Sequence, residues 1–392
     1  MAKKKSDNRA AYRPATALVL AGRSPFEFEG FVNTPIYRGS TVLYETYDDL
    51  AHHRSRYVYG RRGTPTTDAL GSALAAIEKS EGVLLTPSGL SAISTALLSV
   101  VKAGDHILVM DTVYRPTRIV CDGVLKRLGV ETTYFDPLIG DGIEKLLRKN
   151  TSAVFLEAPG SQSFEMPDVP AIAKAAKTHG AVSLIDNTWA TPLYFRPHEH
   201  GIDISIQAGT KYLGGHSDIN LGTISASGAA LSRVQQTHGD LGINPGPEDV
   251  FLALRGLRTM GVRLEKHMQN GIRVAEWLQS QPQVLRVMHP ALESDPGHAL
   301  WKRDFDGACG LFSLILKPQC EANIGAFFDT LNLFGMGYSW GGFESLAIQF
   351  DCAPYRTATK WAPGGPGIRL HIGLEDPDDL IEDLAAGLKA LG

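Results

Sequence analysis

The sequence predicts an α/β protein with a large domain built around a mostly parallel seven-stranded sheet and a smaller α+β domain after it. A chain of 392 residues buries a core large enough for two or three folding units. Short apolar runs alternate with amphipathic patterns between about residues 60 and 228, as in parallel sheets covered by helices. The preceding residues lack sustained periodicity. We therefore expect an N-terminal arm (1–62), an α/β domain (63–257) and a C-terminal α+β domain (258–392).

The elements of the large domain follow from hydrophobic periodicity. Apolar runs of four to six residues predict seven strands, at 82–86, 106–111, 131–135, 153–157, 181–186, 203–207 and 222–225. Amphipathic spacing predicts helices at 67–79, 90–101 and 169–177.

The C-terminal part opens with a long helical pattern over about residues 248–279, which Gly256 and Gly261 interrupt. Strands are then expected at 284–289, 311–316 and 368–372, with helices at about 322–331 and 378–391. These elements predict the smaller α+β domain.

Composition excludes several classes of function. A net charge of −4 gives no electrostatic reason to bind nucleic acid or an anionic membrane. The sequence contains no apolar run of the ~18 residues that span a bilayer, and without an apolar stretch near its start we expect no secretory signal. Its four cysteines have no CxxC spacing, so we expect buried thiols, no metal site and a cytoplasmic location.

Three polar signals follow predicted strands, where ligands collect in open α/β sheets. The turn Ser88-Gly89 before a helix suits a phosphate, although an ordinary serine N-cap is the better explanation of this turn taken alone. Asp186 suits a protonated ring nitrogen or caps a turn. Lys211, among small and apolar residues, suits a nucleophilic amine, although a single lysine is normally a surface residue. Together they supply what pyridoxal 5′-phosphate (PLP) needs.

The order of several motifs resembles the Cys/Met-metabolism family of PLP-dependent enzymes, which have fold type I. The resemblance covers the chain from about Asn33 to the C-terminus. It rests on Tyr57-Val58-Tyr59-Gly60-Arg61, Pro87-Ser88-Gly89, Ile185-Asp186-Asn187-Thr188, Thr210-Lys211-Tyr212, Gly256-Leu257-Arg258-Thr259, Tyr338-Ser339-Trp340-Gly341-Gly342 and Arg369-Leu370-His371-Ile372-Gly373-Leu374-Glu375-Asp376. It implies a carbon–sulfur lyase acting on a small amino acid. A catalytically inactive regulator would not need to retain Lys211 and Asp186.

The resemblance implies a cofactor role for each matching residue. Lys211 would form the Schiff base with PLP and move protons, and Asp186 would keep the ring nitrogen protonated. Tyr114 would stack on the ring; the alternative is an aromatic residue packed under a loop. The phosphate would be held by the N–H groups of Gly89 and Leu90 and by the Thr210 hydroxyl.

The resemblance also implies a shared active site. Tyr59 and Arg61 would reach the phosphate of a neighbouring subunit in a homodimer, usually paired into a homotetramer; the alternative is a polar surface strand. We count Tyr59 with Lys211 and Tyr114 as catalytic. Arg369, helped by Ser339, would bind the substrate α-carboxylate rather than being an exposed strand arginine.

Two positions depart from the family pattern. Many members have a serine where this sequence has Ala208, so a phosphate contact is either missing or made by Ser205 or water. Relatives acting at Cγ often have Asn-Pro where this chain has Ser161-Gln162, which leaves the partner of the PLP phenolic oxygen open.

The site of bond cleavage is predicted from Tyr338-Ser339-Trp340. Relatives acting at Cγ commonly have Glu and Leu where this chain has Tyr338 and Trp340. The change removes a carboxylate and narrows the substrate pocket, which favours β-elimination over γ-lyase or γ-synthase chemistry. A broader cysteine-conjugate β-lyase is a further alternative. We expect Arg115 and Arg118 to form a solvated helix face rather than to bind the substrate's distal carboxylate.

Overall fold

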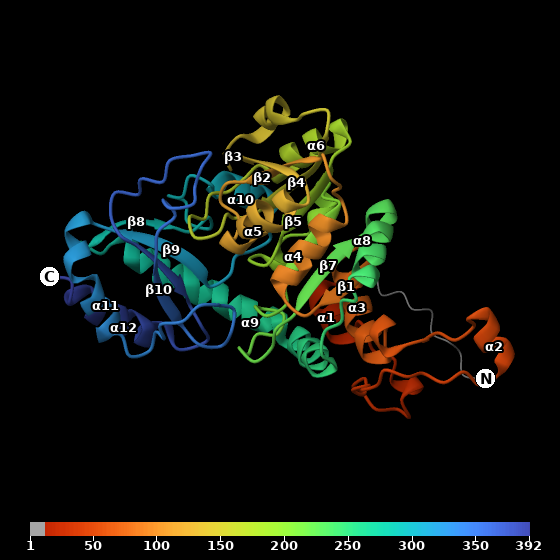
Figure 1. Ribbon diagram of the computed structural model, residues 1–392. Coiled ribbons are helices and arrows are strands. Elements are labelled where there is room, and N and C mark those ends of the chain that lie inside the picture. Colours follow the sequence, from red (N-terminus) through yellow and green to blue (C-terminus); the bar gives the residue numbers. More distant parts are fainter. Residues whose placement is uncertain (1–11) are drawn as a thin grey trace.

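The computed structural model describes residues 12–392 and contains two sheets connected by one long helix (Figure 1). The first eleven residues of the predicted arm therefore lie outside the described part. The large sheet has seven strands in the order β1-β7-β6-β5-β4-β2-β3. Their bounds are β1 Gly82–Thr86, β2 His106–Met110, β3 Glu131–Phe135, β4 Thr151–Glu157, β5 Val182–Asp186, β6 Ile204–Ala208 and β7 Gly222–Ala226.

The large sheet confirms the predicted mostly parallel arrangement. The β3–β2, β2–β4, β4–β5 and β5–β6 pairs are parallel, and only β7 runs against its neighbours β1 and β6. Every residue of β2 and β7 is buried, because helices cover both faces of the sheet. The predicted strands agree with the observed ones to within two residues.

The helices of this domain include the three that periodicity predicts, now bounded as α3 Pro65–Glu78, α4 Gly89–Leu98 and α6 Val169–His179. The start of α3 shows why the sequence begins a helix here. Thr64 and Thr67 form a reciprocal capping box, and Pro65 occupies the first turn, where no N–H is needed. Four further α-helices after residue 62 were not predicted: α5 Arg115–Val120, α7 Thr191–Tyr194 and α8 Gly228–Asp240 in this domain, and α10 His298–Asp304 beyond it.

The helix α9 (Pro247–Gln279) connects the two sheets without a break. The expectation that Gly256 and Gly261 interrupt it was wrong. A Cβ on Gly256 would lie 2.3 Å from the carbonyl oxygen of Leu213, so this glycine allows the helix to approach the loop after Lys211. The expected domain boundary between residues 257 and 258 falls inside this helix, and the division itself stays a prediction.

The smaller sheet is antiparallel, in the order β10-β11-β9-β8. Its bounds are β8 Val284–Met288, β9 Leu311–Leu316, β10 Leu346–Phe350 and β11 Gly367–His371. Helices α11 (Ile324–Thr330) and α12 (Pro377–Lys389) pack together beside it. The edge strand β10 was not predicted.

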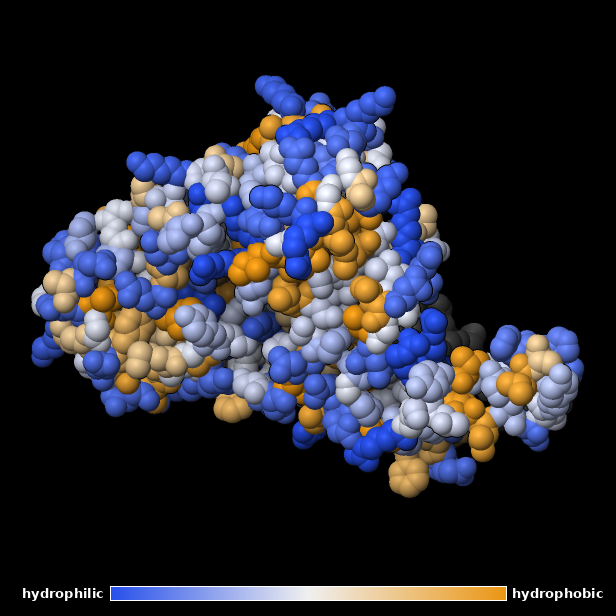
Figure 2. Space-filling model, in the orientation of Figure 1, coloured by the Kyte–Doolittle hydropathy of each residue, from blue (hydrophilic) through white to orange (hydrophobic). Residues whose placement is uncertain are grey.

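The N-terminal arm is only partly irregular. Its helix α1 (Pro14–Leu20) packs on α3 and α9, whereas the segment containing α2 (Tyr47–His52) projects from the body (Figure 1). Hydrophobic residues lie along the projecting part (Figure 2). All four cysteines are buried and free, as predicted. Within residues 12–392, no helix is long and apolar enough to cross a membrane.

Candidate active site

Three strand ends meet at one edge of the large sheet. Strands β1 and β6 are both antiparallel to β7, and β5 is parallel to β6, so all three run in the same direction. Their carboxyl ends, Thr86, Asp186 and Ala208, therefore share an edge, which is where ligands bind in sheets of this kind.

The turn after β1 combines both expected features. Ser88 is the N-cap of α4, and its hydroxyl accepts a hydrogen bond from the Ser91 N–H at 3.1 Å. Gly89 and Leu90 follow as the first helical residues, whose N–H groups have no partner within a helix. A Cβ on Gly89 would lie 2.6 Å from the Ala208 Cβ, so this turn packs directly against the end of β6. The turn is thus both a capped helix start and a group of free backbone N–H donors suited to a phosphate.

Neither of the two hydroxyls considered as phosphate ligands is free beside this turn: that of Thr210 has partners within the protein, and that of Ser205 lies elsewhere. The Thr210 hydroxyl lies 3.3 Å from the Leu221 carbonyl and accepts the Leu221 N–H at 3.1 Å. Ser205 is buried within β6. Its side chain lies on the same face of the strand as that of Gln207, which donates to Glu78, and on the opposite face from that of Ala208. Ser205 therefore does not replace the contact that Ala208 lacks.

Asp186 has a half-buried carboxylate neighbour that sequence reasoning missed. Glu157, the last residue of β4, pairs in register with Asp186 of β5. Burial and the charge of Asp186 raise the pKa of Glu157 well above its usual value, and the Tyr114 N–H that donates to it at 2.6 Å opposes this rise. Burial also raises the pKa of Asp186, although Thr188 and Lys211 oppose it. A cation beside Asp186 would offset the repulsion between these two carboxylates.

Lys211 has the poorly solvated environment that its sequence context predicts. Burial, followed by the charge of Arg369, lowers the pKa of Lys211 to about 8, and Asp186 opposes the shift. The amine donates to the Ser339 hydroxyl at 2.6 Å and lies 5.3 Å from the centroid of the Trp340 ring. The loop after Gly337 therefore reaches Lys211 from the smaller sheet.

Arg369, on β11, faces the same loop. It is 8% exposed, and its Nη2 donates to the Ser339 carbonyl at 2.9 Å. Its buried Nε has no hydrogen-bond partner within residues 12–392. Burial lowers the pKa of Arg369 to about 10. A buried guanidinium with a free donor is suited to an incoming carboxylate.

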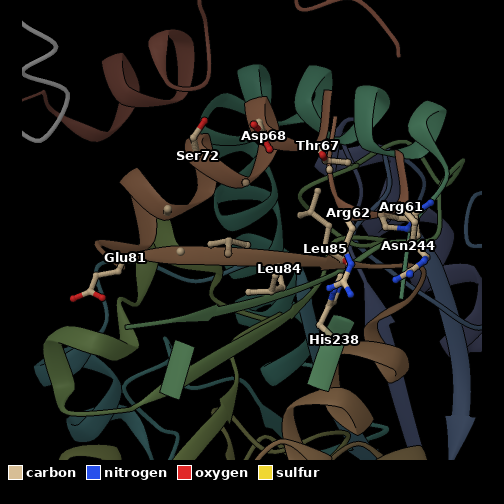
Figure 3. A pocket seen from close by; sticks show the side chains of 16 residues that line it. Arg61, Arg62, Thr67, Asp68, Ser72, Glu81, Leu84, Leu85, His238 and Asn244 are labelled. Atoms are coloured by element: carbon tan, nitrogen blue, oxygen red, sulfur yellow. The ribbon is translucent and has the colours of Figure 1, made fainter. Parts of the chain in front are cut away.

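Within this chain, the arm residues Tyr59 and Arg61 contact groups other than Lys211. Arg61 donates to the Gly239 carbonyl at 3.3 Å, and Tyr59 is half-exposed beside it. Arg61 also lines a cavity of about 290 Å³ between α3 and β1, where it lies near Arg62 and His238 (Figure 3). Tyr338 is likewise exposed, at 90% of its surface.

The expectation of a solvated arginine face was wrong for Arg118. Its side chain is buried and pairs with Asp111 at 2.9 Å. Asp111 also accepts the N–H groups of Thr357, Ala358 and Thr359 at 3.0–3.1 Å. Arg115 is exposed, as expected, and lies 5.5 Å from the Tyr355 ring centroid.

The described site fits PLP on three counts. A glycine-lined helix start offers backbone donors for a phosphate, the buried Asp186 suits a ring N–H⁺, and Lys211 has a pKa low enough to supply a free amine. These features define a PLP-dependent enzyme.

The chain belongs to the family of Cys/Met metabolism PLP-dependent enzymes, which matches residues 15–389, and PLP is its cofactor. It is 44% identical over 385 residues to the cystathionine beta-lyase of Salmonella typhimurium, covering 95% of this chain and 97% of the relative. It is 43% identical over 383 residues to that of Escherichia coli, with the same coverage. The solved cystathionine gamma synthase of Xanthomonas oryzae pv. oryzae superimposes with a TM-score of 0.89 at 32% identity, covering 97% and 98% of the two chains.

Proposed function

We propose that this protein is a cystathionine β-lyase, which converts L-cystathionine and one water molecule into homocysteine, pyruvate and ammonia. Similarity over nearly the whole chain to two enzymes of that name supports the substrate. The observation that carries the reaction type is Trp340, an indole beside the Lys211 amine at a position where γ-acting relatives commonly have an aliphatic residue.

The side chains divide the reaction between them. When bound, PLP supplies an electron sink that acidifies the substrate Cα–H. Arg369 and Ser339 hold the α-carboxylate, and this contact orients the Cα–H bond toward Lys211. With a pKa of about 8, the Lys211 amine removes the Cα proton near neutral pH and then delivers a proton to the departing sulfur. Asp186 would accept a hydrogen bond from the protonated ring nitrogen of the bound cofactor.

Trp340 and its two neighbours restrict the route that the reaction takes after the first proton transfer. The Trp340 ring packs against Tyr212, with centroids 5.6 Å apart, and this contact favours its position beside Lys211. Elimination at Cγ requires a second deprotonation at Cβ, and the triplet Tyr338-Ser339-Trp340 offers no carboxylate for it. Cleavage of the Cβ–S bond needs only the proton transfers that Lys211 already performs.

The arm supports a homodimer whose active sites are shared. Phe26, Leu43 and Tyr47 of the N-terminal arm expose 96%, 86% and 83% of their surfaces. Such a series of large apolar side chains indicates contact with a second chain. In the dimer, Tyr59 and Arg61 reach the neighbour's phosphate, and two dimers form a homotetramer. The enzyme acts in methionine biosynthesis in the cytoplasm.

Product analysis tests the proposed function. The purified holoenzyme is incubated with L-cystathionine, and the released thiol is trapped and identified by mass. Homocysteine is the expected thiol, and the Lys211→Ala protein is the control that should release none. Release of cysteine would instead favour a γ-lyase. Structural similarity to a γ-synthase makes a γ-acting enzyme the main alternative.

A further inference from the structure

The loop that bears Ser339 is pressed against the backbone of the catalytic lysine. A Cβ on Gly341 would lie 3.0 Å from the Lys211 Cα and 2.9 Å from the Tyr212 nitrogen. Ser339 has a φ of 87°, a region that residues other than glycine rarely occupy, and Gly341 has a φ of 85°. A non-glycine residue stays in this conformation only where its surroundings hold it. The loop therefore needs an anchor close to Gly341.

His371 provides that anchor. It ends β11, two residues after Arg369, and is fully buried. Its Nε2 accepts the Gly341 N–H at 3.0 Å, and its Nδ1 lies 3.0 Å from the Glu344 carbonyl oxygen. Because Nε2 accepts, the neutral ring carries its proton on Nδ1, which donates to Glu344. One neutral tautomer thus bonds two points of the loop, Gly341 and Glu344, to the end of β11.

We propose that His371 is a positioning residue for binding of the substrate α-carboxylate. By fixing Gly341, it holds the Ser339 hydroxyl beside Lys211 and the Ser339 carbonyl on Arg369. The inference rests on the proposed function only in taking Arg369 and Ser339 as the carboxylate site. It does not depend on which carbon–sulfur bond is broken.

The far side of the loop has other anchors. The Glu344 carboxylate accepts from the Ser217 hydroxyl at 2.6 Å, and Glu375 accepts the Ser345 N–H at 2.7 Å. These contacts do not involve the imidazole. Loss of the His371–Gly341 bond should therefore displace residues 339–341 without detaching the loop as a whole.

Two substitutions separate the two hydrogen bonds. In His371→Gln, the amide oxygen extends to the level of Nε2 and can accept the Gly341 N–H. In His371→Asn, the shorter amide reaches only the position of Nδ1 and can donate only to Glu344. Both replace the buried ring with a smaller amide, so each controls for the loss of core packing caused by the other.

The free amino acid glycine serves as the ligand in this test, because it has an α-carboxylate and no leaving group. Its dissociation constant is measured for each holoenzyme from the change in visible absorption, with a thermal melt of each protein as the folding check. We expect His371→Asn to weaken glycine binding at least tenfold and His371→Gln to weaken it no more than threefold. Equal effects of the two substitutions, or a larger effect of His371→Gln, would overturn the proposal.

A measurement on the unmodified holoenzyme remains decisive if either variant fails to fold. Hydrogen–deuterium exchange resolved within residues 338–342 should show a protected Gly341 amide. Exchange of Gly341 as fast as that of the exposed Tyr338 would contradict the anchor. Since neither measurement involves turnover, a protein that proved to act at Cγ would leave this inference standing.

Discussion

Opposing influences set the reactivity of Lys211. Burial disfavours its charged form, and the nearby Arg369 adds to this effect, whereas Asp186 favours the charge. Burial is the largest of the three, so the pKa of Lys211 falls to about 8. A lysine with the ordinary value of 10.5 would be almost entirely protonated at neutral pH.

This pKa predicts how the apoprotein takes up PLP. Only the unprotonated amine is nucleophilic, so the rate should rise about tenfold per pH unit below pH 8 and level off above it. The rate is followed by the visible absorption that develops after mixing with PLP. Lys211→Ala should develop none at any pH. A rate that continued to climb to pH 10 would show that the lysine is not perturbed.

Sequence reasoning found the site residues that follow strands and missed those defined by packing. Gly89, Asp186 and Lys211 each come after an apolar run, so the expected sheet edge already placed them together. Glu157 also ends a predicted strand, but its effect on Asp186 depends on which strands are neighbours. His371 matters through a bond to Gly341, thirty residues away, and no spacing rule reveals such a bond.

At the scale of elements, Asp111 joins the two halves of the molecule. It lies immediately after β2, and the N–H groups it accepts belong to the segment between β10 and β11. Burial raises the pKa of Asp111, but the three N–H groups and Arg118 outweigh it and lower the value. The ionised carboxylate is therefore the form that stabilises this junction.

Asp111→Asn should lower the free energy of unfolding by about 3 kcal/mol or more, because it leaves Arg118 buried beside a neutral group. Urea unfolding at neutral pH measures the loss. The matched control is Asp306→Asn, which removes an exposed partner of Arg196 and should cost less than about 1 kcal/mol. Similar losses in the two variants would rule out a special role for the Asp111 junction.

The helices and strands were predicted best where the sequence itself has a clear pattern of apolar residues. The strands of the large sheet are short, mainly apolar runs, and all seven were found. The edge strand β10 is also a short apolar run, LAIQF, although only Ala347 is fully buried in it, and sequence reasoning overlooked it. The glycines of α9 were interpreted as breaks, whereas Gly256 is needed where the helix meets the Lys211 loop. Arg118 was predicted to be a surface residue because its partner, Asp111, lies outside its helix and is not recognisable from the spacing within that helix.

For the whole molecule, the arm predicts that activity depends on assembly. If Arg61 reaches a neighbour's phosphate, Arg61→Ala should raise the PLP dissociation constant by tenfold or more. The constant is measured by titrating apoprotein with PLP, and the oligomeric state by light scattering on the same sample. Arg54→Ala is a control on the same arm, since that side chain pairs with Asp48. A fully active monomer would refute the shared site.

The central claim is β-elimination, and the keto acid formed from L-cystathionine tests it most directly. Chromatography after a fixed turnover should find pyruvate in large excess over 2-oxobutyrate. A difference of ~2.7 kcal/mol between the two barriers already gives about a hundredfold excess. Tyr338→Glu and Trp340→Leu should each reduce that excess while the visible absorption of bound PLP persists. A predominance of 2-oxobutyrate from the unmodified enzyme would contradict the account and identify a γ-lyase.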